Sequence, residues 1–322
     1  MKTCIKITFI VVGCLAIVGC ASGYYIIDRY PISESSDFVL DLNEVRRLVK
    51  AGGGELPTEV RSLVVAELLG PAWAIMAGGG CEKIPFDIVA YQVVYPDGTV
   101  VIDSCFNEEK SYKGISRFVL RTFLLSNFNR EKYALLQDWL KAAKLVLVTH
   151  EHIDHIGGIA ASPYLNDILP KLLLSKEQVE SPVMKKAGFP EGALEGYEGI
   201  SYDRYYQVPV APGIVLIKAP GHAKGQQMIF VTTKDGNEYL FLADVIWNRE
   251  NLKRRVNRPY LVSLGIGEDL DPAREEIRWV LDNLYNNPNN RIIYIIPHDR
   301  DQLTEYIKAG VIKDGFEGGR KP

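Results

Sequence analysis

The sequence predicts an α/β sandwich, in which strands paired in hairpins are covered by amphipathic helices. Two observations indicate this class. Apolar, strand-like runs are joined by short turns, PDG at 96–98 and DGN at 235–237, and segments with helical apolar periodicity lie between such runs. The 322 residues, 47% of them hydrophobic, are enough to build a proper core. A formal charge of −3 gives no basic excess, so no nucleic acid is expected as a partner.

Residues 1–19 are expected to be an export signal. Lys2 and Lys6 precede an apolar run that ends in IVGC and is followed by small residues. This ending resembles the lipobox of bacterial lipoproteins, which implies that Cys20 becomes the lipidated first residue of the mature chain. An uncleaved anchor over residues 7–27 is the alternative, because that stretch would just reach across a bilayer. Either interpretation places the protein in the cell envelope, exported and attached to the membrane.

Residues 20–83 are expected to form a tether followed by an extension of one helix and one strand. The stretch DLNEVRRLVKAG at 41–52 predicts a helix that is closed by consecutive glycines. The stretch TEVRSLVVAELL at 58–69 fits either a helix or a strand, and its β-branched residues favour a strand.

The pattern becomes clearer from residue 84 onward. IVAYQVV at 88–94 and TVVID at 99–103 predict the two strands of a hairpin. A helix is predicted at 129–143, and LVLVT at 145–149 is a short, fully apolar run that is typical of a buried strand. The apolar face of the helix is formed by Leu136, Trp139, Leu140 and Ala143.

The second half of the chain is also predicted to contain both strands and a helix. A helix is predicted at 271–284, with Asp271 as its N-cap and Pro272 in its first turn. Strands are predicted at 214–219, 227–233, 238–243 and 291–296. Two cysteines lie in the body of the chain, Cys81 and Cys105; a disulfide between them and two separate small thiols are both open alternatives.

All five histidines of the chain follow predicted apolar strands, and one aspartate does the same. Three of these histidines share one loop, THEHIDHIGG at 149–158. Because strand ends at one edge of a sandwich converge, these side chains are expected to form one site on loops that the strands hold rigidly. The residues concerned are His150, His152, His155, His222, Asp244 and His298.

The chemistry of this set favours metal binding. Imidazole and carboxylate without thiolate suit zinc, although iron, manganese and cobalt accept the same ligands. In the run H-x-H-x-D-H, the first two histidines can chelate one ion, while Asp154 and His155 face a second. Gly157 and Gly158 are expected to allow a tight turn after the loop. Asp103, in VVIDSC, is expected to support the site or the fold.

The run H-x-H-x-D-H, followed by GH, AD and a late His, resembles the metal signature of the metallo-β-lactamase-fold hydrolases. The resemblance covers about residues 85–305. It implies that residues 84–322 form a single catalytic domain, an αββα sandwich that binds two divalent metal ions, with zinc expected. It also implies that Asp244 bridges the two ions. The first ion would be held by His150, His152 and His222, and the second by Asp154, His155 and His298.

Within this superfamily, the chain looks most like the lactonase-like branch, which includes N-acyl homoserine lactone hydrolases. PGHAKGQQ, LADV and the terminal PHD resemble the motifs PGHTPGHQ, GDA and HD of that branch. Lys224 and Ala243 depart from these motifs. Trp247 stands where the lactonases often carry a Tyr that contacts the substrate.

The expected activity is hydrolysis of an ester-like bond in a small-molecule substrate, with a lactone or ester favoured. A metal-bridging hydroxide would attack the carbonyl, and Asp154 would take or pass a proton in addition to its role as a ligand. A phosphodiesterase, a sulfatase and a β-lactamase of the same fold are the alternatives. An alternative of a different class is a non-catalytic, metal-binding lipoprotein of the envelope.

Two aromatic segments, 106–128 and 197–206, flank the predicted site. They could form an apolar lid for an acyl chain, or they could cover the core. The first segment contains Phe106, Tyr112, Phe118, Phe123 and Phe128, and the second contains Tyr197, Tyr202, Tyr205 and Tyr206.

Overall fold

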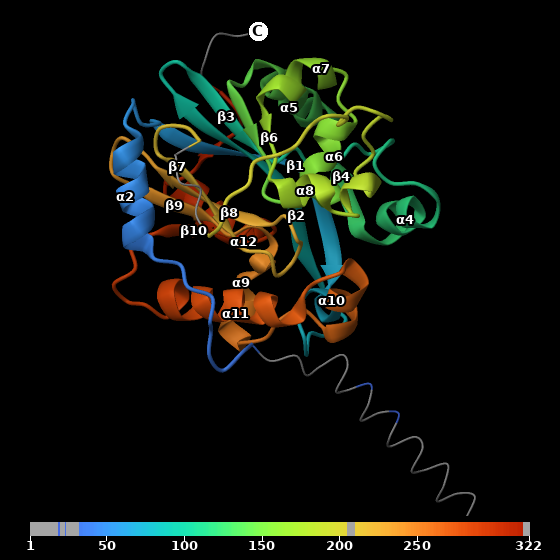
Figure 1. The fold of residues 1–322 in the computed structure, drawn as a ribbon. Coiled ribbons are helices and arrows are strands. Elements are labelled where there is room, and N and C mark those ends of the chain that lie inside the picture. The colour runs from blue at the N-terminus through green and yellow to red at the C-terminus, as the bar shows by residue number, and fades with distance from the viewer. Residues whose placement is uncertain (1–18, 20–22, 24–31, 205–209, 318–322) are drawn as a thin grey trace, which may run out of the picture.

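Two β-sheets lie at the centre of the molecule, with helices on their outer faces (Figure 1). The computed structural model describes residues 19, 23, 32–204 and 210–317. This arrangement confirms the predicted α/β sandwich of helix, sheet, sheet and helix layers.

Apart from Gly19, the predicted signal at 1–19 lies outside the described residues, as does Cys20. In the part of the chain that is described, no helix is long and apolar enough to cross a membrane.

The larger sheet has seven strands, β1 (Glu59–Pro71), β2 (Lys83–Tyr95), β3 (Gly98–Ile102), β4 (Leu125–Phe128), β5 (Leu145–Leu147), β6 (Leu172–Leu173) and β11 (Lys313–Asp314). Their order is β11-β1-β2-β3-β5-β6, and β4 pairs with β1. β1 pairs with β2 in antiparallel orientation from Glu59 to Pro71, so the ambiguous stretch 58–69 is a strand, as favoured. β3 completes the predicted hairpin with β2 and runs parallel to β5.

The smaller sheet has four strands, β7 (Ile214–Lys218), β8 (Gln227–Thr232), β9 (Glu238–Phe241) and β10 (Ile293–Ile295). Their order is β10-β9-β8-β7. β7, β8 and β9 are antiparallel neighbours, whereas β10 runs parallel to β9. The carboxyl ends of β9 and β10 therefore lie at the same edge, which is the edge that the predicted site requires.

Helices cover the outer face of each sheet and bury its apolar side chains. Those on the larger sheet are α5 (Arg130–Ala142), α6 (Ile153–Ala160), α7 (Leu165–Ile168) and α8 (Lys176–Glu180). Those on the smaller sheet are α2 (Leu42–Gly52) and α11 (Leu270–Val280). A third apolar cluster lies between the sheets and includes Val93, Ile102, Leu216 and Ile229. Each outer face thus has its own core, and the two inner faces share a third.

Shorter helical segments connect these elements, and several lie around the edge that carries the site (Figure 1). They are α3 (Ala72–Ile75), α4 (Gly114–Val119), η1 (Leu120–Leu124), η2 (Leu169–Lys171), η3 (Met184–Lys186), η4 (Ala243–Val245), α9 (Arg249–Arg254), α10 (Tyr260–Ile266), η5 (Leu281–Tyr285) and α12 (Arg300–Lys308).

The segment expected to form an N-terminal extension packs within the sandwich. β1 pairs with β2 along its length, and Val45 and Leu48 of α2 lie in the core beneath the smaller sheet. The helix and strand of residues 20–83 therefore belong to the same folded unit as the rest of the described chain.

Cys81 is exposed, Cys105 is buried, and both are free thiols, so they do not form a disulfide.

The prediction of Asp271 as a helix N-cap is wrong by two residues. α11 begins at Leu270, and Asp269 occupies the N-cap position. The carbonyl of Asp269 accepts the first helical hydrogen bond from the N–H of Ala273 (3.1 Å), and its own N–H donates to the carbonyl of Gly221 (2.9 Å). A tertiary contact with the turn after β7 therefore sets where the helix begins.

The role predicted for Gly157 and Gly158, a tight turn, is also wrong. Both residues lie inside α6, and neither has a left-handed backbone. A Cβ atom on Gly158 would lie 2.0 Å from the carbonyl oxygen of Ser104, whereas one on Gly157 would meet the hydroxyl of Ser111 at 2.9 Å. Glycine is needed at 158 because α6 packs directly against the backbone after β3.

We expect the substitution Gly158→Ala to lower the free energy of unfolding by about 1–3 kcal/mol, because the new methyl group meets a backbone atom that cannot rotate away. Gly265→Ala, in α10, is the matched control. Its Cβ atom would meet nothing within 4 Å, so this change should stabilise the protein by about 0.5–1 kcal/mol through helix propensity. Urea denaturation of the two variants measures both effects. Equal stability of the two variants would contradict the packing argument.

Candidate metal centre

The seven predicted ligands are brought together at one edge of the sandwich by loops that follow four strands. β5 leads into the loop of His150 and His152, and α6 begins at Ile153, which places Asp154 and His155 in its first turn. β7, β9 and β10 supply the remaining three ligands, His222, Asp244 and His298. The carboxyl ends of these four strands, β5 in the larger sheet and β7, β9 and β10 in the smaller sheet, all lie at this edge.

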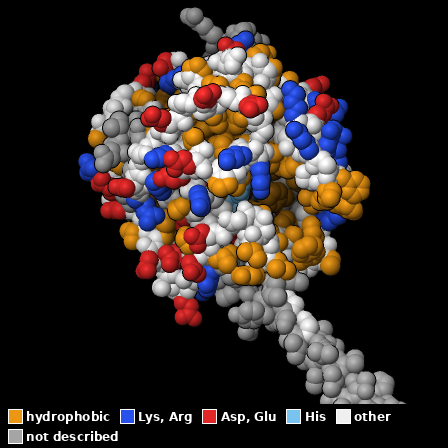
Figure 2. Space-filling model, turned by 45° about the vertical axis from the view of Figure 1, so that its right-hand side comes forward, with side chains coloured by type: hydrophobic (Ala, Val, Ile, Leu, Met, Phe, Trp, Pro, Cys, Tyr) orange, Lys and Arg blue, Asp and Glu red, His pale blue; other side chains and the backbone are white. Residues whose placement is uncertain are grey.

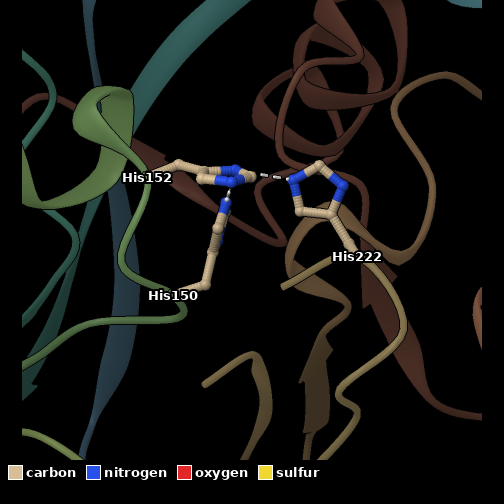
Figure 3. Close-up of side chains that lie close together, drawn as sticks. All are labelled: His150, His152 and His222. Atoms are coloured by element: carbon tan, nitrogen blue, oxygen red, sulfur yellow. Dashed lines mark hydrogen bonds between the residues drawn. The ribbon is translucent and has the colours of Figure 1, made fainter. Parts of the chain in front are cut away.

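The first cluster consists of three imidazoles that point at a common centre (Figure 3). Nδ1 of His152 lies 3.1 Å from Nε2 of His150 and 2.8 Å from Nε2 of His222. Oδ2 of Asp244 lies 3.4 Å from the same nitrogen of His222. Zinc–nitrogen bonds of about 2.0–2.1 Å place two ligands of a tetrahedral site about 3.3 Å apart, so the observed spacing suits a small metal ion.

The second cluster contains Asp154, His155, His298 and the same Asp244. Oδ1 of Asp244 lies 3.3 Å from Nε2 of His155 and 3.1 Å from Nε2 of His298. Oδ2 of Asp154 lies 3.6 Å from Nε2 of His155. Asp244 thus directs one oxygen to each cluster, which is the arrangement of a carboxylate that bridges two ions.

The residues present fit two divalent cations. The donor set is entirely nitrogen and oxygen, and the buried Nε2 of His155 has no hydrogen-bond partner among the described residues. A buried polar atom without a partner is costly unless something outside the protein chain meets it. The nitrogens directed at the two centres lie near one another or near the oxygens of Asp244, which is the environment of a positive charge.

The protonation of His150, His152 and Asp244 suits the same role. Burial, together with the neighbouring His222, lowers the pKa of His152 to about 3, and burial also lowers the pKa of His150 well below its usual value. Both rings are therefore neutral and able to donate a lone pair. Burial opposes the charge of Asp244, but His298, His155 and His150 hold the pKa of its carboxyl well below the usual range.

Hydrogen bonds to the far side of the rings of His155 and His298 fix which nitrogen faces the centre. Nδ1–H of His155 donates to Oδ2 of Asp103 (2.9 Å), and Nδ1–H of His298 donates to the carbonyl of Asp87 (2.7 Å). Asp103 also accepts hydrogen bonds from the N–H and the hydroxyl of Thr149, at 2.7 and 2.8 Å. Of the two roles expected for Asp103, support of the site or of the fold, the hydrogen bond to His155 shows the first. Such bonds hold the tautomer that presents Nε2 to a metal.

Two functional residues were not predicted from the sequence, Glu268 and Arg258. Nδ1–H of His222 donates to Oε1 of Glu268 (2.7 Å), and Arg258 forms a buried ion pair with the same carboxylate. Arg258 also lies over the ring of Trp247 (4.7 Å to the centroid), and Nε1–H of Trp247 donates to Oδ2 of Asp244 (2.7 Å). Although burial opposes its charge, Arg258 and His222 bring the pKa of Glu268 to about 2. No local motif marks either residue, because both reach the site only through tertiary folding.

A cavity of about 730 Å³ opens above the two clusters. Figure 2 shows this hollow, with a histidine visible inside it and apolar side chains along its right and lower edges. His152, Asp154, His222 and Asp244 lie on its wall, and Phe86 stacks on the ring of His298 with centroids 3.9 Å apart. The rest of the wall is mostly apolar and includes Leu68, Ile88, Phe106, Tyr112, Leu120 and Trp247.

The two aromatic segments differ in their relation to this cavity. Phe106 and Tyr112 line it, whereas Phe118 and Phe123 are exposed beside it and Phe128 packs against the core. In the second segment, Tyr197 packs against the core, and the hydroxyl of Tyr202 donates to Gln227. Tyr205 and Tyr206 lie outside the described residues. Of the described aromatic residues in these two segments, only residues of the first segment line the cavity.

Part of this chain is similar in sequence to proteins of known activity. An N-acyl homoserine lactonase of Bacillus thuringiensis is 27% identical over 111 residues, which are 34% of this chain and 42% of the relative. The lactonase of Bacillus cereus is 26% identical over the same share of each chain. The chain thus matches less than half the length of these curated relatives.

Solved structures share the fold over a larger part of the chain. An N-acyl homoserine lactone hydrolase with its product N-hexanoyl-L-homoserine at the metal centre superposes with a TM-score of 0.57 at 16% identity, over 78% of this chain and 96% of that one. A probable metal-dependent hydrolase from Staphylococcus aureus gives 0.53 at 13% identity, over 77% and 91%. At such identities the likeness shows the fold alone.

The family model of the metallo-beta-lactamase superfamily matches residues 84–280. The match covers three of the four strand-end loops of the site, and the fourth, that of His298, follows the matched segment. The sandwich, the two clusters and this match agree, and the chain belongs to the metallo-beta-lactamase superfamily.

Proposed function

We propose that this protein hydrolyses the ester bond of a lactone or ester that carries an apolar acyl chain. The observation that carries this proposal is the position of the two clusters, which share Asp244 and lie on the wall of a largely apolar cavity. A polar reaction centre beside an apolar wall suits a substrate with one polar, scissile end and one apolar end. The similarity to lactonases supports the same class of substrate.

The residues of the first cluster would hold one divalent ion and those of the second cluster another, with zinc suited to both. When bound, the ions supply Lewis acidity and a nucleophilic water at neutral pH. The protein itself provides the geometry. Trp247 and the surrounding imidazoles orient the carboxylate of Asp244, and the hydrogen bonds of Asp103 and Glu268 orient His155 and His222.

Asp154 is the residue we assign to proton transfer. It lies on the cavity wall, and its side chain is 20% exposed, whereas that of Asp244 is almost fully buried. A carboxylate that reaches both the cluster and the cavity can take a proton from the attacking water and pass it to the leaving alkoxide. Phe86, Phe106 and Leu120 would bind the acyl chain and exclude water from the reacting bond.

We also propose that the protein is exported and held at the membrane by its N-terminal segment, through a lipid on Cys20. The sequence of residues 1–20 supports this assignment, with basic residues, an apolar run and IVGC in that order.

The substrate class is tested on a panel of an acyl homoserine lactone, a β-lactam, a phosphodiester, an aryl sulfate and a thioester, with fully metallated protein. We expect the lactone to be turned over fastest, and faster with a longer acyl chain, because the cavity wall is apolar. Turnover of another member of the panel instead would replace the proposal, and turnover of none would favour a metal-binding protein without catalysis.

His152→Ala and Asp154→Ala should each lower kcat/KM by about 100-fold or more, since each removes a group that contacts the reaction centre. Metal content, measured by elemental analysis, should fall in the same variants. Lys224→Ala is the control, because Lys224 is exposed in the turn that carries His222. Unchanged metal content and unchanged hydrolysis in both alanine variants would refute the assignment.

Glu268→Gln should weaken binding at the first cluster by about 10–100-fold, because a neutral amide makes His222 a poorer ligand. Competition with a chromophoric chelator measures the affinity, and thermal unfolding checks that the variant is folded. Glu191→Gln, at an exposed glutamate, is the matched control. Equal affinities of the two variants would show that Glu268 has no influence on the ligand.

Cys20→Ala should abolish the incorporation of labelled palmitate in bacterial cells, whereas Cys14→Ala should leave it unchanged, because only Cys20 follows the IVG sequence. Mass spectrometry of the protein shows whether residues 1–19 are removed. An intact N-terminus without lipid, in both variants and in the unchanged chain, would instead support the anchor over residues 7–27.

A further inference from the structure

Apolar side chains are unusually exposed on two short segments beside the cavity. Most of the large exposed apolar residues in the described part of the chain lie on α4 with η1, or on α10. Six of them, which we call the apolar rim, are between 39% and 83% exposed. They are Ile115, Phe118, Val119, Phe123, Leu261 and Leu264.

The two segments of the apolar rim belong to one opening, although about 140 residues separate them in sequence. Val119, Leu120 and Leu124 line the cavity from one side, and Gly265 and Ile266 line it from the other. Figure 2 shows the apolar side chains along the right and lower edges of the hollow. The apolar wall of the cavity is therefore continuous with an apolar outer surface. An exposed apolar surface of this kind marks a site of interaction with a partner or a membrane.

The start of the described chain lies near this surface. Ile32 is buried against the elements of the smaller sheet, and the hydroxyl of Ser36 donates to the carbonyl of Glu275 in α11 (2.8 Å). α10 directly precedes α11 in the chain, and Figure 1 shows both at the lower side of the molecule, where the described chain begins. From Cys20 to residue 31 there are 12 residues, which span at most about 40 Å. An anchor at the N-terminus would hold the apolar rim within reach of the bilayer.

The charges near the opening suit a phospholipid surface. Lys113 precedes α4 at its N-cap position and is exposed, and Lys186 is exposed and lines the cavity. Lysines beside exposed apolar side chains are typical of segments that lie in a membrane interface, where they meet anionic headgroups.

We propose that the apolar rim docks on a phospholipid bilayer, so that the opening of the cavity faces the membrane and receives an amphiphilic substrate from it. Phe118, Phe123, Leu261 and Leu264 enter the interface, and the acyl chain of the substrate passes from the bilayer into the cavity without crossing water. The identity of that substrate as an ester or lactone rests on the proposed function, whereas the docking does not.

Fluorescence quenching tests the docking without reference to activity. The full chain is reconstituted in phosphatidylethanolamine and phosphatidylglycerol vesicles, with or without brominated acyl chains, as Phe123→Trp, Leu264→Trp and Leu135→Trp. Leu135 is the matched control because it is an exposed leucine on α5, which covers the larger sheet away from α10. After subtraction of the four native tryptophans, the first two variants should be quenched and the control should not.

Equal quenching of all three tryptophans, or quenching of none, would overturn the proposal. A blue-shifted emission at 123 and 264 without quenching would also overturn it, because it would show that a protein surface, such as a second copy of the chain, covers the rim.

A second experiment tests the route of the substrate. The double variant Leu261→Asp, Leu264→Asp should lose the quenching at Phe123→Trp and hydrolyse a long-chain lactone in vesicles several-fold more slowly. Its rate on a short-chain, water-soluble lactone should equal that of the unchanged protein, and Leu135→Asp should change neither rate. If the unchanged protein hydrolyses neither lactone, the proposed substrate is wrong and the quenching result still decides the docking. Equal loss on both lactones would show that the rim supports the fold rather than access from the membrane.

Discussion

The buried carboxylate of Asp244 is the group on which the site depends. Its two oxygens face different clusters, each at 3.1–3.4 Å from ring nitrogens that come from three separate loops. A buried anion is tolerated only where opposite charge or donors surround it. Four histidines and the indole N–H of Trp247 provide that environment. The loop after β5, the turn after β7 and the proline after β10 must therefore keep fixed positions relative to β9.

The sandwich provides those positions because the two sheets pack through their own core. Residues of β2, β3, β7 and β8 fill the space between the sheets, so the strand ends cannot slide relative to one another without opening that core. The close packing of Gly158 against the backbone of Ser104 fixes the position of α6 in the same way. Packing that lies well away from the ligands thus determines the distances between them.

A second layer of charged groups holds the ligands in their working tautomers. Asp103 accepts a hydrogen bond from the Nδ1–H of His155 and Glu268 accepts one from that of His222, and Arg258 neutralises Glu268 within the interior. Burial of a charged group lowers the stability of the fold unless a group of opposite charge or a hydrogen-bonding partner lies beside it. The short helix α10, which lies between Arg258 and Glu268 in the chain, leaves the apolar side chains of Leu261 and Leu264 exposed beside the cavity.

The sequence by itself determined the class of fold, most of the strands and all seven members of the two clusters, because apolar periodicity and histidines after strands are local patterns. It also indicated that Asp103 supports either the site or the fold. It did not determine where α11 begins, why Gly158 is glycine, or that Glu268 and Arg258 belong to the site. Each of these depends on a contact between residues far apart in the chain, Asp269 with Gly221, Gly158 with Ser104, and Glu268 with His222. Only the tertiary structure decided them, because the local sequence around a residue does not specify which distant backbone or side-chain group that residue will contact.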